Sequence, residues 1–218
     1  GLAPSATSAT SASESLTPLA ATSLKVTGKG KKKSRSVALT KGVWAITYVY
    51  TRNADRYGGT NFIAHLDGKK LSYKRLVIND IAKSGKGREN VVIDTTGRYW
   101  IDVSYATSVA NWSMVFTKLG ATKAKRFTGT GATDTKRFKL LAGKTYTFAV
   151  KYSGNRDKYG SNYLGVALSG EKFFNRALVN ESKAARTVVK KVKVTRTGYY
   201  WIDITSALPT VKWTVSYK

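Results

Sequence analysis

The sequence predicts an all-β protein in which an internal duplication has produced two tandem antiparallel β-sandwich domains, jelly-roll-like or immunoglobulin-like. Three observations predict this class. Apolar and polar residues alternate along short segments, which is the pattern of strands with one buried face. The chain matches itself at a shift of about 101 residues. Its 19 glycines and 11% aromatic residues favour strands and turns over helices.

Residues 1–23 precede the repeated part and differ from it in composition. Small and hydroxylated residues dominate this stretch, which holds one acid and no hydrophobic period. It can bury too little apolar surface to offset its ordering entropy, so we expect a disordered tether. Tracts of this composition often separate an export signal or a lipid anchor from an extracellular domain. The stretch therefore predicts a protein that is secreted or attached to the cell envelope, outside the cytoplasm.

The duplication predicts one domain over residues 24–120 and a second over residues 121–218. A Gly-x-Gly motif opens each copy, and a tryptophan lies near the end of each, Trp112 and Trp213. The most similar segments are GRYWIDV at residues 97–103 and GYYWIDI at residues 198–204. The period is far longer than that of solenoid repeats, so each copy is expected to be a whole domain.

Three pairs of strands follow from the alternation, in chain order: residues 44–50 with 146–152, residues 99–103 with 200–204, and residues 112–117 with 213–217. In the first pair the aromatic and aliphatic side chains fall on one face, and the other face of the second copy is more polar. Turns that contain glycine separate these segments, as in antiparallel sheets with one buried face. Helix signals are weak throughout.

The order of several motifs resembles a known family. A Gly-x-Gly and an aromatic strand are followed by NFIAHLDG at residues 61–68, LVIN at residues 76–79, GRYWIDV at residues 97–103 and a final Trp112 with Phe116. This order is similar to that of bacterial pre-peptidase C-terminal domains, which are accessory modules of secreted and surface proteins. The resemblance covers most of each copy and implies a non-catalytic binding or spacer role.

Net charge is the largest compositional signal, because 38 Lys and Arg stand against 12 Asp and Glu, a formal charge of +26. Both copies contribute, with 17 cations against 6 acids in residues 28–120 and 20 against 5 in residues 121–218. This excess favours anionic polymers such as teichoic acid or a sulphated glycan as partners, with nucleic acid as a further, non-specific one. The residues predicted to bind polyanions form two groups: Lys31, Lys32, Lys33 and Arg35, and then Lys190, Lys191, Lys193 and Arg196.

The second group lies on a predicted strand. Val192 is expected to point inward, and Lys191 and Lys193 outward, about 7 Å apart along the strand. Residues 136–139, with three further cations, would add to this group if the two strands were neighbours. The alternative role of these lysines is to protect a sheet edge against aggregation, or to provide solubility alone.

Two tryptophans with a nearby carboxylate suggest a different ligand. If Tyr99 and its alternating neighbours point into the core, Trp100 and Asp102 point outward, and Trp201 and Asp203 repeat this arrangement. An outward tryptophan beside a carboxylate is a stacking platform and hydrogen-bond acceptor for a sugar ring. The alternative is that this face is also covered and that both tryptophans belong to the core.

A polar loop recurs in both copies and resembles the start of a calcium loop. Its shared residues are Asn53, Asp55 and Tyr57, and Asn155, Asp157 and Tyr159. Ala64 and Val166 stand where a calcium loop has its bidentate acid, and Arg56 and Lys158 would repel a cation. A turn held by Asx hydrogen bonds explains the pattern better, and we expect no metal.

Catalysis is not expected. The chain has no cysteine, and its single histidine, His65, is replaced by Ala167 in the second copy. No Gly-x-Ser-x-Gly turn, phosphate loop or recurring pair of carboxylates is present. No apolar run approaches the length of a membrane-spanning helix. The sequence therefore predicts a non-catalytic exported protein without cofactor that binds or adheres through basic surfaces. A carbohydrate-binding module and a structural spacer without ligand are the alternatives.

Overall fold

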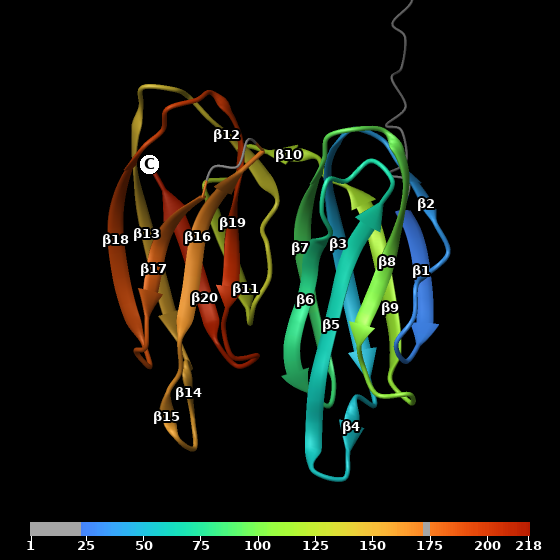
Figure 1. Cartoon of the computed structure of the whole chain (residues 1–218). Helices are drawn as coiled ribbons and strands as arrows, with labels where there is room; N and C mark the ends of the chain where they lie inside the picture. The colour runs from blue at the N-terminus through green and yellow to red at the C-terminus, as the bar shows by residue number, and fades with distance from the viewer. Residues whose placement is uncertain (1–22, 172–174) are drawn as a thin grey trace, which may run out of the picture.

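The computed structural model describes residues 23–171 and 175–218, and in this part of the chain every regular element is a β-strand (Figure 1). The predicted tether lies outside the described residues, except for Ser23, where β1 begins. Nothing in the described part is a helix that could span a membrane. The predicted all-β class with two tandem antiparallel sandwiches is confirmed.

The first sandwich, repeat 1, is built from two antiparallel sheets. One has the order β1 (Ser23–Lys29), β9 (Asn111–Lys118), β3 (Gly42–Thr51), β7 (Gly85–Ile93). The other contains β2 (Val37–Leu39), β8 (Gly97–Tyr105), β5 (Gly58–Gly68), β4 (Ala54–Asp55) and β6 (Arg75–Ala82), the last two pairing with β5.

The second sandwich, repeat 2, reproduces this order and adds one edge strand, β10, which pairs in parallel with β12. Its first sheet is β11 (Arg126–Thr130), β20 (Lys212–Tyr217), β13 (Thr145–Ser153), β18 (Arg186–Lys193). Its second sheet is β10 (Ala121–Thr122), β12 (Arg137–Leu140), β19 (Gly198–Ser206), β16 (Leu164–Gly170), β17 (Asn175–Glu181). The short strands β14 (Arg156–Asp157) and β15 (Gly160–Ser161) form a hairpin that corresponds to β4 and the start of β5. The duplicated sequence thus gives a duplicated strand order.

Each repeat has its own hydrophobic core between its two sheets. In β8, Tyr99, Ile101 and Val103 are fully buried, as the alternation predicts. Their counterparts on β19 are buried in the second core. Burial of one face on each strand is the main force that holds the two sheets of a sandwich together.

The Gly-x-Gly motif has a packing role. Gly28 of β1 lies against the ring of Trp112, and a Cβ added to it would be 2.1 Å from the Cζ2 atom of that ring. The indole N–H of Trp112 donates to the carbonyl of Gly30, whose φ is 62°. Repeat 2 repeats this arrangement with Gly129, Trp213 and Gly131. Only glycine leaves room for the ring and adopts the left-handed turn without strain.

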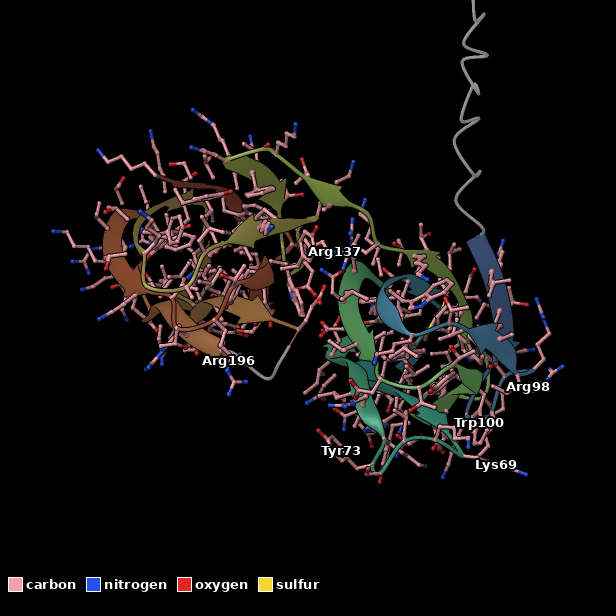
Figure 2. The ribbon with its side chains drawn as sticks, turned by 90° about the horizontal axis from the view of Figure 1, so that it is seen from above. Lys69, Tyr73, Arg98, Trp100, Arg137 and Arg196 are labelled. Atoms are coloured by element: carbon pink, nitrogen blue, oxygen red, sulfur yellow. The ribbon has the colours of Figure 1, made fainter. Side chains whose placement is uncertain are left out.

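The two sandwiches pack against each other through different faces. In repeat 2, Trp201 of β19 packs on Val43 and Ala45 of β3 and on Leu119, with Val92 at the margin. This contact joins the second sheet of repeat 2 to the first sheet of repeat 1. As a result, β18 lies at one end of the molecule and β1 and β2 at the other in both views (Figures 1 and 2).

Candidate functional site

The sheet β11-β20-β13-β18 of repeat 2 carries many cations, most of them on its outer face. Its four strands contain no Asp or Glu and hold seven Lys and Arg residues: Arg126, Lys151, Arg186, Lys190, Lys191, Lys193 and Lys212. All seven are exposed. No acid within this sheet neutralises these charges, but Arg186, which lies opposite the buried Tyr152, pairs with Glu181 of β17 in the other sheet at 2.7 Å.

The lysines of β18 point outward as the alternation predicts. Val192 is buried, whereas Lys191 and Lys193 are exposed and lie opposite Thr147 and Thr145 of β13. Lys190 differs from them, because it lies opposite the buried Phe148 and so belongs to the inward-pointing set. It is nevertheless exposed, because β18 is the edge strand of this sheet and its long side chain can pass beyond the edge.

Threonine and serine side chains separate the cations of this face. The backbone of Lys218 exchanges two hydrogen bonds with that of Thr147 on β13, at 2.9 and 3.2 Å. Since Lys191 pairs with Thr147 from the other side, Thr147 separates Lys218 from Lys191. Lys151 lies between Thr187 and Thr214 of the adjacent strands. Cations and hydroxyl groups together can donate several hydrogen bonds to phosphate or sulfate oxygens.

The aromatic residues of the same four strands all pack toward the core. Phe148, Tyr152 and Trp213 are buried, and Phe127, Tyr146 and Tyr217 are partly buried against the same core. The cationic face therefore offers charge and hydroxyl groups but no aromatic platform for a base or a sugar.

The other predicted group of cations lies on repeat 1, far from β18. Residues 31–35 connect β1 to β2 and run along β8, where Val103 donates its N–H to the carbonyl of Lys32 at 3.0 Å. The N–H of Ser34 donates to the carbonyl of Ile101 at 2.8 Å. Lys31, Lys32, Lys33 and Arg35 are all exposed. The structure thus keeps each predicted group together but separates the two groups.

Three other cations do not join the β18 group, because the condition for it, that their strand neighbours β18, is not met. Lys136, Arg137 and Lys139 lie on or beside β12, which pairs with β19 in the opposite sheet of repeat 2. Arg137 forms an ion pair with Glu171 at 2.5 Å and stacks on Tyr199. It faces the space between the two sandwiches (Figure 2). The alternation reveals which face a residue is on but not which strands are neighbours.

Arg196 follows β18 in the turn to β19 and is exposed. Its carbonyl accepts a hydrogen bond from the hydroxyl of Tyr200 at 2.6 Å, which holds the turn against the core. It extends the cationic edge beyond Lys193.

Trp100 lies on the outer face of repeat 1, on the side away from repeat 2 (Figure 2). The residue is half-buried, and its indole N–H is buried without a hydrogen-bond partner. The ammonium of Lys33 lies 5.6 Å from the ring centre. Asp102 pairs with Lys74, which is also 3.8 Å from Asp67. An aromatic ring, two carboxylates and two ammonium groups therefore meet on this face.

Sequence reasoning missed two members of this face. His65 of β5 lies directly opposite Asp102 of β8, and its Nδ1 atom has no hydrogen-bond partner. Tyr105 pairs with Ile63 beyond a bulge and is 59% exposed. Tyr99, Ile101 and Val103 point inward, and alternation alone would place Tyr105 with them. The bulge in the pairing with β5 turns Tyr105 outward, and this bulge is visible only in the strand register.

Trp201 and Asp203 are not an exposed platform, and this prediction is corrected for repeat 2. Trp201 is 5% exposed because it fills the contact with repeat 1. Asp203 lies beside Asp134 in the same contact. The expectation of outward tryptophans assumed that the outer faces of both copies meet solvent. Packing of one copy on the other covers one of them.

Hydrogen bonds reinforce the contact between the repeats. The backbone N–H of Asn90 donates to Oδ2 of Asp134 at 2.5 Å, and its side-chain amide donates to the carbonyl of Thr135 at 2.9 Å. The N–H of Asp134 donates to the carbonyl of Arg88 at 3.1 Å. Residues 134 and 135 therefore cover the free edge of β7, as native proteins often do with sheet edges.

Burial raises the pKa values of the carboxyl groups in this contact. For Asp134 and for Glu89 the cause is burial first, and then the charges of neighbouring carboxylates; the pKa of Glu89 rises to about 8. Burial also raises the pKa of Asp203. These raised pKa values reflect the cost of placing charged carboxylates close together in a buried site.

The shared polar loops are Asx-type turns. The Asp55 carboxylate accepts the N–H of Tyr57 at 2.8 Å, and Asp157 accepts that of Tyr159 at 2.8 Å. Asn53 is buried, and its amide donates to the carbonyls of Thr60 and Ala82. Asn155 makes the equivalent bonds to the carbonyls of Asn162 and Lys183. The asparagines thus hold the hairpin to the sandwich, and the aspartates form the turn.

The hairpin tips expose one tyrosine each. Tyr57 is 82% exposed and Tyr159 is 85% exposed. Arg56 and Lys158 lie 4.6 and 4.8 Å from the respective ring centres. Within the described residues no cluster of three or more possible metal ligands occurs, at these loops or elsewhere.

Comparison with known proteins does not assign this chain to a family. No family model matches this chain, and no curated protein matches it. Among solved structures, the tandem CBM22-1-CBM22-2 domains of Paenibacillus barcinonensis Xyn10C are 8% identical and cover 90% of this chain and 86% of that one, with a TM-score of 0.30. A Macrobrachium rosenbergii nodavirus structure is 10% identical and covers 100% of this chain and 95% of that one, with a TM-score of 0.23. The resemblance to pre-peptidase C-terminal domains stays a prediction.

Proposed function

We propose that this chain is a non-catalytic, exported protein of the cell envelope that binds anionic polymers through the outer face of the sheet β11-β20-β13-β18. The observation that carries this proposal is the charge of the four strands, which hold no acid and place five cations on the outer face: Arg126, Lys151, Lys191, Lys193 and Lys212. Export is supported by the Ser/Thr/Ala-rich composition of residues 1–23.

The arrangement of the face favours a flexible polymer with regularly spaced phosphate or sulfate groups. Side chains two residues apart on one strand are about 7 Å apart, and neighbouring strands are about 4.8 Å apart. Lys191 and Lys193 therefore present two ammonium groups along β18, with Thr145 and Thr147 beside them on β13. Long lysine side chains adapt to such a polymer and bind it mainly by releasing its counterions.

The lack of an outward aromatic residue on this face argues against single-stranded nucleic acid as the preferred ligand. Proteins that bind single strands commonly stack bases on aromatic side chains, and each stacked base contributes about 1–3 kcal/mol. All six aromatic residues of these strands pack toward the core instead. We therefore propose teichoic-acid-like polyol phosphates or sulphated glycans as the ligand class.

Retention on a heparin column tests this proposal. We expect the protein to bind at low salt and the logarithm of its affinity to fall linearly with the logarithm of salt concentration. Replacement of Lys190, Lys191 and Lys193 by Gln should weaken binding and reduce the slope by about 1 for each lysine that contacts an anion.

The control replaces three exposed lysines of repeat 1, Lys41, Lys83 and Lys86, by Gln, which removes the same charge from another surface. If this control loses as much affinity as the β18 variant, binding depends on net charge and not on the proposed face. If the wild-type protein is not retained even at low salt, the basic surface serves solubility alone.

Trp100 supports a second candidate, a carbohydrate-binding surface on repeat 1. The specific observation is a half-buried indole ring on the outer face, on a strand segment that pairs with Asp67 and His65 and also carries Asp102. Sugar binding by stacking would persist at high salt and would be lost in Trp100→Ala. In the same column experiment, polyanion binding should be nearly unchanged by Trp100→Ala, so the two candidates give opposite results.

A further inference from the structure

The two predicted groups of cations lie on opposite ends of the molecule. Residues 31–33 follow β1 and run along β8 in repeat 1, whereas Lys191 and Lys193 lie on the edge strand β18 of repeat 2. In both views β18 occupies one end and β1 and β2 the other, with the contact between the repeats in the middle (Figures 1 and 2). One rigid polymer segment on one surface cannot touch both groups.

Both groups are exposed and uncompensated. Within the described residues, no ion pair joins a carboxylate to any of the six lysines at positions 31, 32, 33, 190, 191 and 193. Asp102, which is near Lys33, is instead paired with Lys74. Each end therefore has ammonium groups without a carboxylate partner that can meet an external anion, and the Lys33 ammonium also lies 5.6 Å from the centre of the Trp100 ring.

The backbone at both ends is held in place. Residues 32 and 34 are hydrogen-bonded to β8 at 3.0 and 2.8 Å, so Lys31 to Lys33 start from a fixed segment. Lys190 to Lys193 are part of an eight-residue register with β13. Ordered presentation lowers the entropy that a binding site loses when its ligand binds.

The contact between the repeats prevents the two ends from turning toward each other. Trp201 is buried against Val43 and Ala45, and Asn90 forms two hydrogen bonds with the 134–135 segment. The connection from β9 to β10 is only residues 119 and 120, and the N–H of Leu119 donates to the carbonyl of Val43 at 2.8 Å. The molecule is thus a short rod with one cationic group at each end.

We infer that one molecule bridges two anionic polymer chains, one bound by residues 31–33 of repeat 1 and the other by Lys190, Lys191 and Lys193 of repeat 2. This inference rests on the proposed function, because it uses the same polymer chemistry, a chain of phosphate or sulfate groups. It adds a consequence that one binding face alone would not have: the protein cross-links the polymer network instead of coating single chains.

A capture experiment with short ligands tests the bridge. A sulphated oligosaccharide is immobilised on a sensor surface, the monomeric full-length protein is bound to it, and a fluorescent copy of the same oligosaccharide is then added in solution. We expect the wild-type protein to capture the soluble ligand, and calorimetric titration to give two ligands per molecule. A parallel arm with a glycerol-phosphate oligomer shows whether the polyol phosphate is bridged in the same way as the sulphated glycan.

Two variants remove one end each, and a third is the control. The variants K31Q/K32Q/K33Q and K190Q/K191Q/K193Q should still bind the surface but capture no soluble ligand, with a stoichiometry that falls from two to one. The control K41Q/K83Q/K86Q should capture like the wild type. Surface binding by the wild type without capture, or full capture by either one-end variant, overturns the bridge and leaves the binding function intact. Absence of any surface binding at low salt overturns the proposed function itself.

Discussion

Trp100 and Trp201 are the same residue of the same motif, yet they have different environments. Trp100 is half-buried on an outer face, whereas Trp201 is 5% exposed in the contact between the repeats. The partners of each ring account for the difference, because Lys33 lies near Trp100 and Val43, Ala45 and Leu119 surround Trp201. A tryptophan gains stability from burial in proportion to the apolar area removed from water.

The pair gives a matched test of the contact between the repeats. Trp201→Ala removes a buried ring and should lower the free energy of unfolding by about 3 kcal/mol. Trp100→Ala removes a half-exposed ring and should cost about 1 kcal/mol or less. Urea unfolding at neutral pH measures both. Equal losses for the two variants would contradict the assignment of Trp201 to the contact.

At the scale of the element, β7 and β18 show how the duplicated strands have diverged. Both are edge strands of corresponding sheets, but the 134–135 segment covers β7 and nothing in the described residues covers β18. At the positions that correspond to Asn90 and Val92 on β7, β18 has Lys191 and Lys193. Exposed lysines protect an open edge from pairing with another chain, and they are also the cations of the proposed binding face.

The packing of β11 on β20 gives a second prediction. Ala at position 129 would place its Cβ 2.3 Å from the Cζ2 atom of Trp213, so the ring must move. Gly129→Ala should therefore destabilise repeat 2 by about 1–3 kcal/mol. The control is Gly120→Ala, where nothing lies within 4 Å of the added Cβ, and it should change stability by less than about 0.5 kcal/mol. Thermal unfolding of both variants checks the difference.

At the scale of the whole molecule, the contact between the two sandwiches is polar and contains carboxyl groups with raised pKa values. Glu89 of repeat 1 lies near Asp134 and Asp203 of repeat 2, and Arg88 and Tyr48 are the other titratable groups near them. Because the pKa of Glu89 rises to about 8, the packed form keeps at neutral pH a proton that the separated form releases. The contact is therefore linked to pH.

The direction of this dependence follows from the pKa of Glu89, which rises from 4.5 to about 8. The packed state binds more protons, so the contribution of Glu89 to stability is complete below pH 4.5. It decreases as the pH rises through the interval up to about 8. We expect the stability of the contact to fall between pH 5 and pH 8 and Glu89→Gln to reduce this fall. Urea unfolding of both proteins across that range measures it, and an equal pH dependence in the two would refute the role of Glu89.

The sequence by itself was sufficient for the class of fold and for the inward faces of the strands. Tyr99, Ile101 and Val103 are buried as their alternation predicts, and Lys191 and Lys193 are exposed. Local alternation and the internal match carry this information, since the period of side chains along a strand is fixed by backbone geometry. The Asx turns at Asp55 and Asp157 are equally local, and the sequence predicted them.

Only the tertiary structure decided which outer faces meet solvent. It buried Trp201 and left Trp100 only half-buried, although the two lie in nearly identical motifs. It also placed Arg137 in the sheet opposite to β18 and put residues 31–33 and 190–193 at opposite ends of the molecule. The physical reason is that alternation reports the side of one strand, whereas sheet order and the packing of one repeat on the other depend on contacts between residues that are distant in the chain.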